Sequence, residues 1–312
     1  TLNESAFIQE GFQKFRFGQL SEAESIFRKI LKSNPENTDA IHLLGLVAFQ
    51  TGNYDASVNL ISSAVKLDPC NPAYLNSLGN IYLNSDNYDD AIANYRKALS
   101  LESNDAGSHC NLGNALKSKG LLFEAADSYL DSITCQPDYE TAYYNLGILQ
   151  QELGQHDSAV ANYQKAIELR PVFSDAINNL GNTYKELGKI DDALTSYKLA
   201  LELNPKSSKT HFNMHALLLN SEDMLPAINC LKKAVDINSR IKDKLYLSVC
   251  LDYAGYSDQA NLLFDEIDAR GSPKDRARMD AWKYLKSTNS IFPTIFGSSI
   301  DAFNLAFEAA SS

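Results

Sequence analysis

The sequence lacks the features that mark membrane-spanning and secreted proteins. No apolar run approaches the ~18 to 20 residues needed to cross a bilayer, and Thr1–Glu4 shows neither the basic segment nor the apolar core of a signal peptide. The cysteines are odd in number and have no C-x-x-C spacing, which argues against a disulfide framework and a zinc site: Cys70, Cys110, Cys135, Cys230 and Cys250. We therefore expect a cytoplasmic protein whose cysteines are small buried side chains.

Familiar catalytic motifs are also missing. The chain has no G-x-S-x-G, no H-E-x-x-H, no G-x-x-x-x-G-K-[ST] and no strand-flanked G-x-G-x-x-G. His211-x-x-x-His215 would place two imidazoles on one helical face, but no third ligand is evident nearby. We interpret these histidines as packed or hydrogen-bonded, and we expect this chain to be no enzyme and to hold neither a metal ion nor a cofactor.

Positive charge is scarce. Lys and Arg number 28 against 39 Asp and Glu, which gives a net charge of -11. The average field repels phosphate backbones and anionic lipid, which excludes nucleic acid and membrane as expected partners. A neutral or basic polypeptide is the expected partner.

What the sequence does contain is a repeat. Asn-Leu-Gly occurs at 111–113, 145–147 and 179–181, with an interval of 34 residues each time. Around it recur Leu at repeat position 7, Gly at 8, aromatics at 11 and 24, Gly near 15, Ala at 20 and 27, and Pro at 32, which is typical of helix-turn-helix arrays. Repeats 3 to 6 fit best, while repeat 7 has Met214 and His215 at positions 7 and 8. The eight predicted repeats start at Glu4, Thr38, Pro72, Ala106, Glu140, Ser174, Ser208 and Ile241.

These residues resemble tetratricopeptide repeats. The resemblance implies an all-α fold, a right-handed α-α superhelical solenoid of about eight 34-residue helix-turn-helix repeats over residues 4–270. For residues 271–312 we predict a helical C-terminal cap or a linker to an absent domain. In the cap, Trp282, Phe292 and Phe296 would cover repeat 8, and a further helix would span 299–310.

A column of asparagines forms the candidate site. Repeat positions 6 and 9 share one face of the first helix of each repeat, on the inner wall expected for such an array. Side-chain amides at regular intervals offer donors and acceptors suited to the backbone of an extended peptide. Alternatively, these amides only hydrogen-bond neighbouring helices. The predicted peptide-binding residues are Asn111, Asn145, Asn179 and Asn213 at position 6, with Asn80, Asn114 and Asn182 at position 9.

The asparagine column is similar to that in the repeat region of O-linked N-acetylglucosamine transferases. This resemblance implies that Asn111, Asn145, Asn179 and Asn213 bind peptide backbone. The leading prediction is a non-enzymatic scaffold that binds an extended polypeptide in a concave groove. The alternative is the substrate-recruiting N-terminal region of a larger glycosyltransferase or methyltransferase whose catalytic domain lies beyond this chain. Self-association through repeat 1 is a third prediction.

A carboxylate clamp, as in chaperone co-factors with similar repeats, does not fit. The corresponding residues in repeats 3 to 5 contain the asparagines but no cation: Asn76, Asn80, Asn111, Thr141 and Asn145. A carboxylate bound there would lose its hydration without a compensating charge. We therefore exclude this binding mode for these repeats.

Overall fold

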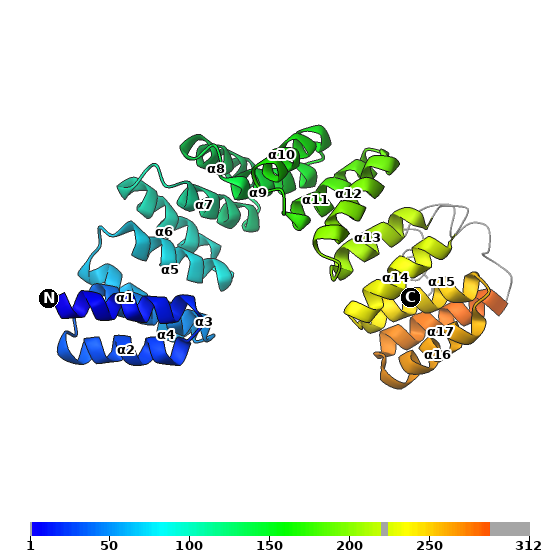
Figure 1. Ribbon diagram of the computed structural model, residues 1–312, viewed down its shortest axis with the longest axis horizontal. Helices are drawn as coiled ribbons and strands as arrows, with labels where there is room; N and C mark the ends of the chain where they lie inside the picture. Colours follow the sequence, from blue (N-terminus) through cyan, green and yellow to red (C-terminus); the bar gives the residue numbers. More distant parts are fainter. Residues whose placement is uncertain (1, 220–223, 288–312) are drawn as a thin grey trace. The chain divides into compact units, whose positions relative to one another are not determined.

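The computed structural model describes residues 2–219 and 224–287, and this part of the chain contains 17 α-helices and no β-strand (Figure 1). The all-α prediction is confirmed. Helices alternate along the chain as the first and second helix of each repeat, here called helix A and helix B. The helices group into two compact units, residues 1–153 and 154–312, and each unit is described by itself.

The first unit contains nine helices, and each helix B packs against the helix A before it and the helix A after it. Its helices A are α1 (Leu2–Arg16), α3 (Thr38–Gln50), α5 (Pro72–Asn84), α7 (Ala106–Ser118) and α9 (Glu140–Glu152). Its helices B are α2 (Leu20–Ser33), α4 (Tyr54–Leu67), α6 (Tyr88–Leu101) and α8 (Leu122–Cys135). From repeat 2 onward, each predicted repeat start is the first residue of a helix A.

The second unit continues the alternation and ends, within the described range, in one additional helix. Its helices are α10 (His156–Leu169), α11 (Ser174–Glu186), α12 (Ile190–Leu203), α13 (Ser208–Leu218), α14 (Leu225–Ile237), α15 (Ile241–Tyr253), α16 (Ser257–Arg270) and α17 (Pro273–Ser287). The described part of the predicted C-terminal segment contains one helix, α17, which begins at Pro273.

A left-handed residue separates helix A from helix B in most repeats. Gly154 and Gly188, predicted for this turn, have φ of 71° and 72°. Repeat 3 has Asp86 instead, with φ of 56°. Glycine adopts this conformation without a Cβ penalty, and aspartate is among the few other residues that tolerate it.

Helices A and B approach closely because glycine at position 8 faces a tyrosine ring at position 24. A Cβ atom on Gly113 would lie 2.5 Å from Cε1 of Tyr129, and one on Gly79 or Gly181 would lie 2.7 Å from Cε1 of Tyr95 or Tyr197. All three tyrosines are 0% exposed. The space above each glycine is therefore filled by the ring, which explains why the two columns recur together.

Repeat 7 has different residues at these two positions. His215 is at the glycine position with 1% exposure, and Leu231 is at the tyrosine position. The His215 Nδ1–H donates to the Ala227 carbonyl at 2.9 Å, which satisfies the buried ring. In repeat 2, Ser57 replaces the position-20 alanine and donates its hydroxyl to the Gly45 carbonyl at 2.7 Å. Each departure from the pattern thus brings its own hydrogen bond.

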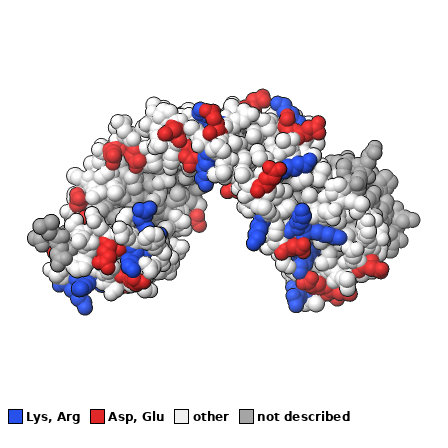
Figure 2. All heavy atoms as spheres, in the orientation of Figure 1, with Lys and Arg blue, Asp and Glu red and all other residues white. Residues whose placement is uncertain are grey.

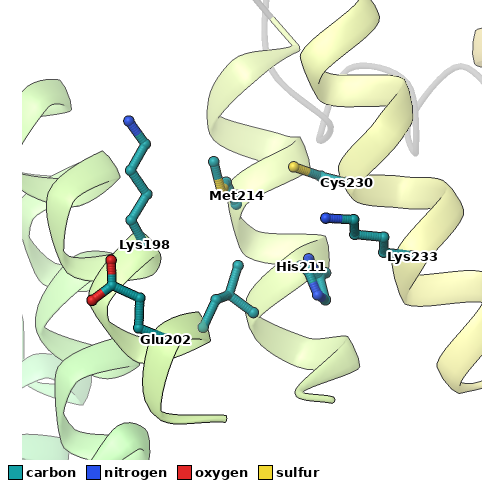
Figure 3. Close-up of a pocket in the computed structure, with 7 residues that line it drawn as sticks. Lys198, Glu202, His211, Met214, Cys230 and Lys233 are labelled. Atoms are coloured by element: carbon teal, nitrogen blue, oxygen red, sulfur yellow. The ribbon is translucent and has the colours of Figure 1, made fainter. Parts of the chain in front are cut away.

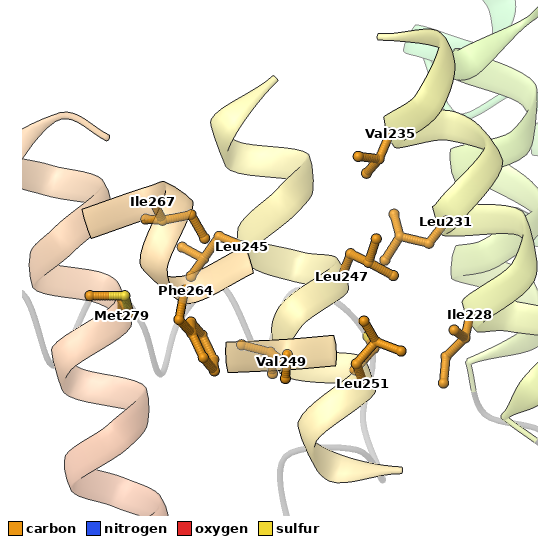
Figure 4. Close-up of a cluster of buried hydrophobic side chains, with 12 residues drawn as sticks. Ile228, Leu231, Val235, Leu245, Leu247, Val249, Leu251, Phe264, Ile267 and Met279 are labelled. Atoms are coloured by element: carbon orange, nitrogen blue, oxygen red, sulfur yellow. The ribbon is translucent and has the colours of Figure 1, made fainter. Parts of the chain in front are cut away.

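The core of the second unit extends into α17. Figure 4 shows a buried cluster drawn from α14, α15, α16 and α17, in which Met279 of α17 lies beside Phe264 and Ile267 of α16. Helix α17 therefore covers part of the last repeat. The predicted roles of Phe292, Phe296, the 299–310 helix and the Trp282 side chain lie outside what the structure describes. The predicted boundary between array and cap stays a prediction.

The cysteine prediction is wrong in part. Cys110 and Cys250 are buried, but Cys70 is exposed and Cys135 and Cys230 are intermediate. Cys70 follows Pro69 in the loop between α4 and α5, where a short connection lies at the surface. All five thiols are free. Among the described helices, none combines the length and apolarity required to cross a membrane.

Candidate functional site

The position-9 asparagines are held by the tyrosines that pack on the glycines. In repeats 3, 4 and 6, the tyrosine hydroxyl donates to the asparagine Oδ1 fifteen residues earlier in the chain. Burial raises the pKa of each tyrosine, so the hydroxyl keeps its proton and acts as the donor. The bonds are Tyr95 to Asn80 at 2.6 Å, Tyr129 to Asn114 at 2.8 Å and Tyr197 to Asn182 at 2.7 Å.

Asn145 connects two neighbouring helices A in the first unit. Its Nδ2 group donates to Asn114 Oδ1 at 3.0 Å and lies 3.3 Å from the Cys110 Sγ, which accepts a second, weaker bond. Burial raises the pKa of the Cys110 thiol to about 11, although the bond from Asn145 acts in the opposite direction. The structure therefore brings Asn114 and Asn145 together across α7 and α9.

The position-6 asparagines of the second unit lie in a more enclosed network. Asn213 Nδ2 donates to Asn178 Oδ1 at 3.0 Å, and Asn178 Nδ2 donates to Asn179 Oδ1 at 3.3 Å. The Lys209 ammonium also reaches Asn179 Oδ1 at 3.4 Å. Asn179 is only 7% exposed, so its side chain is part of the protein interior rather than open to a groove.

Position-6 side chains hydrogen-bond to repeat position 5, which the predicted site did not include. Three hydrogen bonds join position 5 of one repeat to position 6 of the next, 35 residues on, including the His42 Nε2 to Ser77 Oγ contact at 2.8 Å. Asn178 belongs to this set and was missed. The constant separation was visible in the sequence, but periodicity alone does not show which face of a helix meets its neighbour.

Asn76 and Asn111 interrupt this pattern. They occupy positions 5 and 6 of repeats 3 and 4, yet Asn76 Nδ2 donates to Asp105 Oδ2 at 3.3 Å. Asn76 Oδ1 is buried and has no hydrogen-bond partner. Asn111 is partly buried, and its amide makes no hydrogen bond within the described ranges. Repeat 4 therefore presents a side-chain amide that has no hydrogen-bond partner in the described part of the chain.

The histidine interpretation is confirmed by two separate hydrogen bonds. His211 Nε2–H donates to the Pro205 carbonyl at 3.1 Å, whereas His215 donates to Ala227. Burial lowers the pKa of both imidazoles, which favours the neutral form. The part of the chain that the structure describes contains no cluster of three or more potential metal ligands among His, Cys, Asp and Glu.

A pocket of about 330 Å³ lies among α12, α13 and α14 of the second unit (Figure 3). Its lining combines charged, apolar and sulfur-bearing side chains: Lys198, Leu201, Glu202, His211, Met214, Cys230 and Lys233. Burial raises the pKa of the Cys230 thiol, and the nearby Lys233 lowers it less. The thiol is therefore protonated and a weak nucleophile at neutral pH.

Acidic residues lie in pairs at the starts of two helices B. Asp89 and Asp90 are in the first turn of α6, and Asp191 and Asp192 are in the first turn of α12, where carboxylates favour the positive end of the helix dipole. The equivalent residues 222 and 223 lie outside the described ranges. On the face seen in Figure 2, acidic and basic side chains are interspersed, with wide areas that carry neither.

Family models match much of the array. A TPR repeat model matches residues 79–120, and a tetratricopeptide repeat model matches residues 141–173 and 174–207. The chain contains tetratricopeptide repeats. A model described as anaphase-promoting complex, cyclosome, subunit 3 matches residues 18–98. These matches establish the repeats but provide no specific link to O-linked N-acetylglucosamine transferases.

Solved tetratricopeptide structures share the fold. The Cut9-Hcn1 hetero-tetramer of the APC/C matches with a TM-score of 0.65 and 17% identity over 78% of this chain and 48% of that chain. PilF of Pseudomonas aeruginosa matches with a TM-score of 0.58 and 20% identity over 66% of this chain and 94% of that one. MamA is 30% identical with a TM-score of 0.49, and the match covers 53% of this chain and 97% of that one. None of the curated proteins matches the sequence.

Proposed function

We propose that this tetratricopeptide-repeat chain is a non-enzymatic scaffold that binds an extended polypeptide on the helix-A face of the first unit. This helix-A face is the surface of α5, α7 and α9 that carries Asn80, Asn111, Asn114 and Asn145. The observation that supports the proposal is that three consecutive helices A carry partly buried, uncharged amides at equivalent positions, two of which, Asn114 and Asn145, share a direct hydrogen bond. Asn182 and Asn213 would form a corresponding site in the second unit.

An amide row suits main-chain recognition because it does not select a side-chain charge. Extended polypeptides expose one N–H and one C=O per residue, and side-chain amides can pair with both groups. Asn111 has no partner inside the described chain, so a ligand can use its donor and its acceptor without breaking a protein hydrogen bond. The net charge of -11 favours a neutral or basic partner.

Selection from a library of random linear peptides tests the proposal. We expect the Asn80→Ala/Asn111→Ala/Asn114→Ala variant to bind the selected peptides at least about tenfold more weakly, since each lost hydrogen bond costs ~0.5–1.5 kcal/mol. The Asn59→Ala/Asn94→Ala variant, altered on helices α4 and α6, is the matched control and should bind like the wild type.

Folding of the variants has to be separated from binding. Asn80 and Asn114 accept tyrosine hydrogen bonds, so their loss also destabilises the protein, whereas Asn111→Ala removes no described hydrogen bond. Asn111→Ala alone should weaken binding without lowering the urea midpoint. If the triple variant and Asn111→Ala both bind the selected peptides as tightly as the wild type, the amide row is not part of the binding site.

The alternative stays a prediction: this chain would be the substrate-recruiting region of a larger glycosyltransferase or methyltransferase. The specific relation to O-linked N-acetylglucosamine transferases also stays a prediction. Both are compatible with the same peptide-binding face, because recruitment of a substrate polypeptide would use the same amides. Self-association through repeat 1 also stays a prediction.

A further inference from the structure

The two columns of asparagines expose opposite ends of their amides. At position 9 the Oδ1 atom is taken by a buried tyrosine hydroxyl in three repeats, at 2.6 to 2.8 Å. Phenol hydroxyl groups at these sites stay protonated because burial raises the tyrosine pKa. The amide is thereby oriented with Nδ2 as its remaining group, and in Asn80, Asn114 and Asn182 that group has no partner within the described chain.

Two of the four position-6 asparagines, Asn145 and Asn213, show the reverse arrangement. Asn145 and Asn213 each donate from Nδ2 to a residue of the preceding helix A, at 3.0 Å to Asn114 Oδ1 and at 3.0 Å to Asn178 Oδ1. The group left over on each is Oδ1, an acceptor. Position 9 therefore offers donors, and Asn145 and Asn213 at position 6 offer acceptors, although the residue type is the same.

We infer that Asn114 and Asn145 act as one polarised unit that reads a main chain: Asn114 Nδ2–H donates to a peptide carbonyl, and Asn145 Oδ1 accepts from a peptide N–H. This inference rests on the proposed function and specifies its chemistry. The direct bond between the two amides holds donor and acceptor at a set separation across α7 and α9. Because both groups of the unit are uncharged and opposite in polarity, an extended main chain satisfies them, whereas a carboxylate satisfies only the donor.

Asn182 and Asn213 occupy the equivalent positions in the second unit, although no direct hydrogen bond joins them within the described residues. They occupy position 9 of repeat 6 and position 6 of repeat 7, as Asn114 and Asn145 do in repeats 4 and 5. Asn182 is oriented by Tyr197, and Asn213 is oriented by Asn178. The polarity is thus imposed twice, by different neighbours, on the same two repeat positions.

Asn114→Asp tests the polarity with little change in shape. An aspartate oxygen still accepts from Tyr129 and Asn145, but the outward donor becomes an acceptor. We expect binding of an uncharged peptide to fall at least about tenfold, because a carbonyl would face a carboxylate. Asn59→Asp, on the exposed surface of α4, makes the same chemical change away from the site and should have no effect.

A defined probe makes the test independent of an unknown partner. The probe is a synthetic peptide of alternating serine and threonine, acetylated and amidated, and the readout is the NMR signal of each asparagine NH2 group. Addition of the probe should shift the Asn114 protons downfield and leave those of Asn59 in place. In Tyr129→Phe, which frees the Asn114 amide to rotate, we expect binding weaker by roughly two- to tenfold.

The outcomes separate the inference from the proposed function. If Asn111 responds to the probe but Asn114 does not, or if Asn114→Asp binds as tightly as the wild type, the polarity is wrong while the peptide-binding face stands. If no amide of α5, α7 or α9 responds, both the polarity and the proposed function are overturned.

Discussion

Repeats 4 and 7 fill the same space with opposite choices of residue. In repeat 4, the small Gly113 faces the large Tyr129, whereas in repeat 7 the larger His215 and the smaller Leu231 occupy the two equivalent positions, and both are buried. Both solutions leave the helix pair closely packed, and each is completed by one hydrogen bond, from Tyr129 to Asn114 or from His215 to Ala227. Close packing of helices A and B therefore depends on total volume rather than on one fixed residue pair.

Of the two, only the repeat 4 solution orients an asparagine at position 9. The tyrosine hydroxyl reaches position 9 of the preceding helix and orients an asparagine there. In repeat 7, position 9 is Ala216 and Leu231 has no hydroxyl, so no oriented amide results. The position-9 asparagines are therefore oriented by residues that also pack helices A and B together, and three experiments test this difference between the two repeats.

The largest effect is expected from converting repeat 7 toward repeat 4. His215→Gly should destabilise the protein by about 3–5 kcal/mol, because it leaves a cavity beside Leu231 and places glycine inside a helix. Adding Leu231→Tyr should recover ~0.5–3 kcal/mol, the range of coupling between residues in contact. Urea unfolding measures both values. If the two substitutions change the free energy of unfolding by amounts that simply add, residues 215 and 231 do not fill a common space.

An intermediate effect is expected from adding one methyl group in repeat 4. Gly113→Ala would place a Cβ 2.5 Å from the Tyr129 ring, so we expect a loss of about 1–3 kcal/mol. Gly107→Ala in the same helix is the matched control, because its Cβ would come no closer than 3.4 Å to Asp105 Oδ1. The control should be neutral or slightly stabilising in urea unfolding. Equal effects of the two substitutions would contradict the close contact.

The smallest effect is expected from acid. Burial lowers the pKa of His215, and it lowers that of His42 to about 4, although Asp39 opposes the shift in His42. The unfolded chain then binds more protons below about pH 6.5, so stability falls as the pH drops from there toward the native pKa. The slope should approach ~1.4 kcal/mol per pH unit for each histidine.

Urea midpoints between about pH 7.5 and pH 5.5 measure this slope. The His215→Gly/Leu231→Tyr variant lacks one of the three histidines whose pKa is lowered, His42, His211 and His215, and should lose less stability in acid than the wild type. His42→Gln is the complementary variant for repeat 2. An unchanged slope in both variants would mean that other groups cause the acid sensitivity.

Much of the fold could be predicted from the sequence because the period is rigid. Helix starts at Pro72, Ala106 and Ser174 were correct to the residue, since each repeat must bury the same face against its neighbours. Met214 and His215 marked repeat 7 as irregular, but the pattern could not show that the His215 ring replaces the volume of a tyrosine. That compensation involves residues on two different helices.

The candidate site was predicted less completely. The asparagine positions were readable as a column, and whether they bind peptide stays a prediction. Their environments were not readable: Asn179 is buried, Asn145 bonds to Asn114, and Asn111 bonds to nothing within the described chain. Side-chain accessibility depends on the neighbouring repeat, which a single repeat motif does not contain.

The amino-acid sequence alone gives the period, the first residue of each helix A from repeat 2 onward and the columns of glycine and aromatic residues, because these follow from local helix geometry and from one contact repeated at a constant interval. The orientation of each amide, by contrast, depends on the tertiary structure. A side-chain amide has a donor end and an acceptor end, and which end faces outward is set by the tyrosine, asparagine or cysteine that a neighbouring helix brings within hydrogen-bond distance.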